Sequence, residues 1–105
     1  MHDAHDGSLS AADAWLKANI APLLASATFQ KDGILIIVFD ESASTDTQHG
    51  GGHVTAVVVG PKVSAGRKSS VLYQHQNTLK TLMKALGLSS YPGLAGGASP
   101  MNDMF

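Results

Sequence analysis

Acidic and imidazole side chains frame one loop of this 105-residue chain. Asp40 and Glu41 directly follow an apolar run, and His49 and His53 flank three glycines just before the next apolar run. Carboxylates can hold a divalent cation or exchange protons, and imidazole can bind a transition metal or phosphate or carry protons. The loop therefore indicates a metal or phosphoryl site. The alternatives are that Asp40 only caps the backbone and that both histidines are simply exposed.

A second group of such side chains lies at the start of the chain, where the sequence reads MHDAHDG. His2, His5 and Asp6 belong to two closely spaced His-Asp pairs that could supply ligands together with their hydrogen-bonded partners. Chain ends are usually poorly ordered, so these residues taken alone favour a solvated terminus.

Two apolar runs must position the loop. Residues 34–39 and 54–59 are short, uninterrupted and rich in β-branched side chains, which is typical of strands covered on both faces of an α/β sheet. The connection of about a dozen residues has no helical pattern, so the pairing should be antiparallel. Asp40, Glu41 and His53 would then converge at one edge of the sheet.

The first helix is expected over residues 11–26. Ser10 followed by Asp13 resembles a capping box, apolar residues recur at helical spacing, and Pro22 should kink the helix because it lacks an N–H. Residues 31–33 then form a turn signal before the first strand.

The second helix is expected from about Gln74 to Leu86, with Gly87 as the left-handed residue that ends it. The helix should be amphipathic, with one apolar face that carries Leu79, Leu82, Met83 and Leu86. His75, at the start of the helix, is expected to have a structural or solvent-facing role. Residues 88–105 read as an irregular tail.

The number of strands is small for a sheet that is apolar on both faces. The chain supplies two clear strands and a short third candidate near residues 71–73, so its sheet edges should be open and adhesive. We therefore expect residues 1–105 to form a single partial domain that lacks an N-terminal half or assembles as a homo-oligomer.

Composition excludes several classes of protein. The chain is 44% hydrophobic and 14% charged, which indicates a globular protein, and a net charge of −1 disfavours a nucleic-acid partner. Without cysteine there is no disulfide framework and no thiolate metal site. The apolar runs are too short for a transmembrane segment, and the polar start lacks the features of a signal peptide.

The order of these segments resembles the C-terminal part of the phosphoesterase family. The residues that carry the resemblance are ADAWLKANIAPLLASATFQKDGILIIVFDES, HGGGHVTAVVVGPKV, YQHQNTLKTLMKALGL and the ending PMNDMF. The family includes bacterial acid phosphatases and phosphocholine-type phospholipases C, and family members are commonly periplasmic or secreted. The resemblance implies an α/β fold, namely the C-terminal part of an alkaline-phosphatase-like mixed sheet flanked by helices.

The resemblance also implies roles for the loop residues. Asp40 and Glu41 stand where the alkaline phosphatase superfamily has an Asp-His metal motif, so they look like ligands of a divalent metal ion. The glutamate departs from the superfamily pattern but agrees with the acidic pair usual in the family. His53 is similar in position to the superfamily's third histidine, with His49 as its rival, and either is implied to be catalytic.

The N-terminal segment resembles the family's His-Asp segment, which contributes to the phosphate pocket. By that resemblance His5 is implied to be catalytic, and His2 and Asp6 to contact the phosphate of the substrate.

The implied activity of the full domain is metal-assisted hydrolysis of a phosphate ester. The hydroxyl nucleophile and early Glu-Asn pair of the family have no match here, and Ser42 and Ser44 do not occupy the nucleophile's place. We therefore expect a C-terminal piece of a catalytic domain. The alternative is a non-catalytic remnant that binds a metal or an anion and assembles with a partner chain.

Overall fold

The computed structural model describes residues 4–105, which divide into two compact units. The first comprises residues 4–35 together with Val59–Lys62, and the second comprises Ile36–Val58 and Val63–Phe105. His2, predicted to contact the substrate phosphate, lies outside the described residues.

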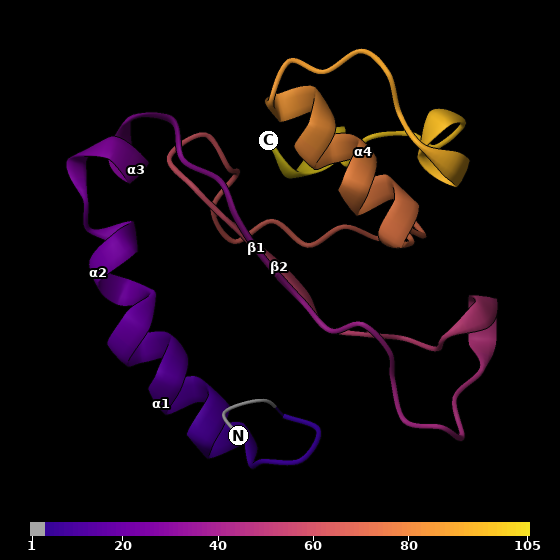
Figure 1. The fold of residues 1–105 in the computed structure, drawn as a ribbon, viewed down its shortest axis with the longest axis horizontal. Coiled ribbons are helices and arrows are strands. Elements are labelled where there is room, and N and C mark those ends of the chain that lie inside the picture. The colour runs from indigo at the N-terminus through magenta and orange to yellow at the C-terminus, as the bar shows by residue number, and fades with distance from the viewer. Residues whose placement is uncertain (1–3) are drawn as a thin grey trace. The chain divides into compact units, whose positions relative to one another are not determined.

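The first unit contains three consecutive helices, α1 (Leu9–Asn19), α2 (Ala21–Leu24) and α3 (Ala27–Asp32) (Figure 1). The predicted interruption by Pro22 is confirmed, because α1 stops before it and α2 restarts with the proline in its first turn, where no N–H is needed. The capping assignment was wrong. Ser8 caps α1, and its hydroxyl accepts a hydrogen bond from the Ala11 N–H at 3.1 Å.

Helix α3 was not predicted, because residues 31–33 suggested a turn. The Ser26 hydroxyl accepts the Phe29 N–H at 3.2 Å and so starts the helix, which ends at Gly33. Phe29 is buried, and a Cβ at Gly33 would overlap its ring. The lack of a side chain at Gly33 therefore allows close packing against Phe29. Residues 31 and 32, predicted as a turn, belong to the end of α3, and the chain leaves the helix at Gly33.

The two strands pair as predicted. β1 (Leu35–Val38) and β2 (Ala56–Val59) form a two-stranded antiparallel sheet (Figure 1), and the Phe39 N–H donates to the Thr55 carbonyl at 3.2 Å just beyond it. The expected burial of both faces was wrong, since β1 is only half-buried and Val57 of β2 is 44% exposed. Within residues 4–105 the sheet gains no third strand at 71–73. A larger mixed sheet stays a prediction.

The second unit contains α4 (His75–Ala85), close to the predicted bounds. Gln74 caps it in a reciprocal box with Asn77, and Gly87 follows at φ 73°, the left-handed position predicted for it. The apolar face is not a core face, since Leu79 is 41% exposed and Leu86 76%.

The opposite, polar face of α4 is the one that is packed. Thr81 is 6% exposed; its hydroxyl donates to the Asn77 carbonyl at 2.7 Å and accepts the Met101 N–H at 2.8 Å. Met101 and Ala95, from the tail, are also buried. Lys80 donates to the Gly96 carbonyl at 3.0 Å. The tail that looked irregular therefore supplies the core of this unit, through two 3₁₀ turns at Gly93–Gly96 and Asn102–Met104.

Asp103 fastens the end of the tail. Its carboxylate accepts hydrogen bonds from the Ser69 hydroxyl at 2.6 Å and from the Tyr73 hydroxyl. These two bonds, the Ser69 bond first, hold the pKa of Asp103 below its ordinary value, and the bond to Asp103 raises the pKa of Tyr73. The PMNDMF ending is thereby tied to the segment that leads into α4.

We predict that Thr81→Val destabilises the chain more than Thr81→Ser, which keeps the hydroxyl and loses only a buried methyl group. Valine matches threonine in shape but leaves the Met101 N–H without its acceptor, which costs about 1–3 kcal/mol for a buried group. Chemical denaturation of the three proteins measures the difference. Equal unfolding midpoints for valine and serine would show that the hydroxyl contributes nothing.

Candidate functional site

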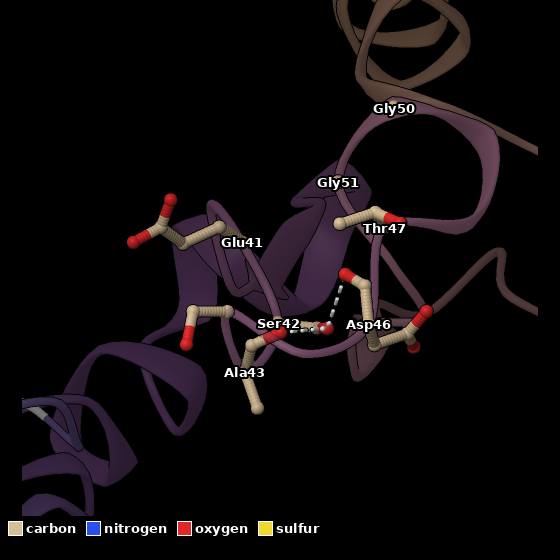
Figure 2. A pocket seen from close by; sticks show the side chains of 8 residues that line it. Glu41, Ser42, Ala43, Asp46, Thr47, Gly50 and Gly51 are labelled. Carbon is tan, nitrogen blue, oxygen red and sulfur yellow. Dashed lines mark hydrogen bonds between the residues drawn. The ribbon is translucent and has the colours of Figure 1, made fainter.

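The loop between β1 and β2 surrounds a hollow of about 240 Å³ (Figure 2). Its lining combines carboxylates, hydroxyls and exposed glycine backbone, from Glu41, Ser42, Ala43, Ser44, Asp46, Thr47, Gly50 and Gly51. Carboxylate and hydroxyl groups therefore lie along the border of this hollow. All of these residues belong to the second unit.

Asp46 organises the loop from within. Its carboxylate accepts the His53 N–H at 2.9 Å and the Gln48 N–H at 3.2 Å. These backbone bonds, the one from His53 first, hold the pKa of Asp46 below its ordinary value. Asp46 was not among the predicted site residues, although an aspartate in a loop often accepts the N–H two residues further on, in an Asx turn.

Gly52 lets the loop close on Asp46. It has φ 75°, and a Cβ there would lie 2.6 Å from the Asp46 carbonyl oxygen and would overlap the Ser42 hydroxyl. Figure 2 shows that hydroxyl between the Ala43 and Asp46 carbonyls, which it approaches at 3.4 and 3.5 Å. One of the three glycines is therefore required by both its conformation and its surroundings.

The predicted metal ligands lie at the start of the loop, and both are exposed. One carboxylate oxygen of Asp40 accepts the Glu41 N–H at 3.1 Å, so the capping role weighed from the sequence is present. A carboxylate offers about four acceptor positions, so this bond leaves room for a cation. The Glu41 carboxylate points away from that of Asp46 (Figure 2), so these two do not share a ligand position.

The start of α4 holds the loop from outside. His75 Nε2 lies 2.6 Å from the Asp40 carbonyl oxygen, and the Gln74 side-chain amide donates to the His49 carbonyl at 2.8 Å. His49 itself has φ 54°, an uncommon conformation for a residue with a side chain. The structural role expected for His75 is thus a contact with the backbone of a predicted metal ligand.

The predicted site residues are only partly brought together. Asp40, Glu41, His49 and His53 share one loop of the second unit, whereas His5 and Asp6 belong to the first unit. Across residues 4–105, no three His, Asp or Glu side chains are grouped closely enough to hold a metal ion. The expected convergence of Asp40, Glu41 and His53 is therefore not seen as a three-ligand group among these residues. The predicted roles of these residues stay predictions.

Comparison with known proteins assigns the family. The family model described as Phosphoesterase family matches residues 1–89, so the chain belongs to the phosphoesterase family. It is 30% identical over 92 residues to the phosphate-repressible acid phosphatase of Penicillium chrysogenum, a match that covers 85% of this chain and 22% of that protein.

Two further relatives carry similar names. The chain is 30% identical over 106 aligned positions to the phosphatidylinositol-3-phosphatase of Mycobacterium tuberculosis, covering 99% of this chain and 32% of that protein. It is 27% identical over 92 residues to an acid phosphatase of Aspergillus fumigatus, a match that covers 85% of this chain and 20% of that protein. The chain thus spans between a fifth and a third of the length of these relatives.

No solved structure matches the chain significantly. The resemblance to the alkaline phosphatase fold therefore rests on sequence. Within residues 4–105, no helix has both the length and the apolar character needed to cross a membrane.

We predict that Gly52→Ala opens the loop, because the new methyl group meets the Ser42 hydroxyl and Asp46 at a left-handed φ. Hydrogen exchange at the Gln48 and His53 amides should speed up. Gly97→Ala is the matched control, since a Cβ there meets nothing within 4 Å. Unchanged protection of both amides in Gly52→Ala would contradict the proposed closure.

The lowered pKa of Asp46 predicts a specific dependence of stability on pH. An unfolded aspartate titrates near 3.8 and the folded one below it, so the stabilisation is present above pH 3.8 and is lost as the pH falls through the folded value. The stability difference between wild type and Asp46→Asn should be constant near neutral pH and change only in this acidic window. A difference that is independent of pH in denaturation curves would contradict the assignment.

Proposed function

We propose that this chain supplies part of a phosphoesterase active site that hydrolyses phosphate esters with the help of a divalent metal ion. The observation that carries the proposal is the placing of Asp40 and Glu41, directly after β1 at the mouth of the loop, within a sequence of the phosphoesterase family. The acid phosphatase names of two relatives support this class of reaction.

The donor set suits a hard or borderline divalent cation. Asp40 and Glu41 are adjacent exposed carboxylates, and oxygen ligands of this kind favour magnesium, manganese or calcium. Two carboxylates do not complete a coordination shell, so the remaining ligands come from elsewhere in the functional protein. When bound, such a cation lowers the pKa of a nearby hydroxyl or water and offsets charge on phosphate oxygens.

The histidines are proposed to handle protons and phosphate. His53, held through its backbone by Asp46, and His49, held through its carbonyl by Gln74, have exposed side chains at the same loop. Neutral imidazole can accept a proton, and imidazolium can bind phosphate oxygens. His5 is proposed to share the catalytic work, with His2 and Asp6 contacting the substrate phosphate.

The nucleophile is proposed to lie outside the matched segment. The chain spans at most about a third of its relatives, and none of its serines follows the family order expected of a nucleophile. We propose that another part of a larger domain, or a second copy of the chain, completes the site.

A non-catalytic binding function is the second candidate. It is favoured by the exposed leucines of α4 and by the small sheet, both of which suit assembly with another chain. In that case the acidic pair would bind a cation, or the loop would bind an anion, and no substrate would be turned over.

The test combines Mn²⁺ binding with hydrolysis of p-nitrophenyl phosphate. We expect Asp40→Asn and Glu41→Gln each to weaken Mn²⁺ binding about tenfold or more, as loss of a carboxylate ligand should, while Asp13→Asn on α1 leaves it unchanged. Equal Mn²⁺ affinity in all four proteins would remove the metal role. Metal-dependent turnover by the chain alone would show that the nucleophile lies within it, and binding without turnover agrees with a partial site.

A further inference from the structure

We infer that Gln74 and His75, the two residues at the start of α4, are positioning residues for the loop that carries the acidic pair. This inference rests on the proposed function for its consequence in catalysis, but its geometry stands independently. Neither residue is among the predicted ligands or proton carriers.

The contact of His75 fixes the first end of the loop. Its Nε2 lies 2.6 Å from the Asp40 carbonyl oxygen, across a separation of 35 positions in the sequence. A carbonyl oxygen only accepts, so Nε2 must carry a proton and donate it in this bond. The Asp40 carboxylate in turn accepts the Glu41 N–H, so that the backbone of the acidic pair is held on both sides of their shared peptide.

The contact of Gln74 fixes the far side of the loop. Its side-chain amide nitrogen donates to the His49 carbonyl at 2.8 Å, across 25 positions. His49 is the residue with φ 54°, a conformation that costs about 1–2 kcal/mol for a residue with a Cβ. The hydrogen bond from Gln74 helps to keep the backbone in this costly conformation.

The helix end that makes both contacts is itself well anchored. The Gln74 backbone N–H donates to the Asn77 side chain at 2.8 Å, and the Gln74 side-chain oxygen accepts from the Asn77 backbone and from Gln76. The oxygen of the Gln74 amide therefore caps the helix while its nitrogen reaches the loop. The Gln74 side chain therefore caps the helix and also contacts the loop, and a substitution can remove the second contact while keeping the first.

The consequence is a fixed direction for an exposed pair of carboxylates. Exposed loops sample many conformations unless something holds them, and groups behind metal ligands commonly tune affinity by about 10–100-fold. With both loop contacts intact, Asp40 and Glu41 present their carboxylates from a single backbone conformation. Without them the closure on Asp46 remains, but the ends of the loop are released from α4.

The experiment uses the full chain and two pairs of variants. Gln74→Glu keeps an acceptor for the helix cap but loses the donor to His49, and His75→Leu loses the donor to Asp40. His75→Gln can restore that donor, and Lys84→Leu, at the other end of α4, is the control. Hydrogen exchange of residues 40–53 and the affinity for Mn²⁺ are measured for each.

We expect loop exchange to accelerate about fivefold in Gln74→Glu and in His75→Leu, the loss of a typical single hydrogen bond, with α4 amides unchanged. Mn²⁺ affinity should fall about tenfold in His75→Leu and recover in His75→Gln. Unchanged loop exchange in both donor-deficient variants overturns the inference, as does a uniform loss of protection throughout α4 in Gln74→Glu. A wild type that fails to bind Mn²⁺ while His75→Leu loosens the loop removes the proposed metal function and leaves the positioning role supported.

Discussion

The two hydrogen bonds of the Thr81 hydroxyl determine how the second unit is built. By joining the Asn77 carbonyl to the Met101 N–H, they bury the polar side of α4 against the tail. A buried hydroxyl with both a donor and an acceptor partner specifies one orientation, whereas an apolar contact tolerates several. The orientation of α4 then fixes where its first residues lie, and those residues reach the loop after β1. The tail thus influences the candidate site through the helix.

The loop is ordered from two directions that do different work. Asp46 accepts hydrogen bonds from backbone N–H groups inside the loop and so closes it. Gln74 and His75 instead bind the carbonyl oxygens of His49 and Asp40 from outside the loop. Gly52 makes the inner arrangement sterically possible. The acidic pair and the two histidines are therefore exposed side chains on a backbone that these contacts restrain.

Local patterns in the sequence predicted the regular elements well. The uninterrupted β-branched runs gave both strands and their antiparallel pairing, and the spacing of leucines together with Gly87 gave α4. Helix α3 was missed in the prediction because six residues are too few to show a helical period and its only N-terminal signal is the Ser26 cap. The face of α4 that is packed could not be predicted, since Thr81 finds its partner in a tail with no periodic signal. In the candidate site, residue type predicted roles for Asp40, Glu41, His49 and His53, and these stay predictions. The local contacts of Asp46 with Gln48 and His53 were overlooked, whereas the contact of Gln74 spans 25 positions and leaves no signal in residue spacing.

The exposed leucines of α4 have a consequence for how this chain behaves in solution. A row of apolar side chains on a helix gains free energy when it leaves water, and near room temperature that gain is almost entirely entropic. Attraction of this origin weakens on cooling and strengthens with salts such as sulfate that are excluded from protein surfaces. Any self-association through these leucines would therefore be least in the cold at low ionic strength.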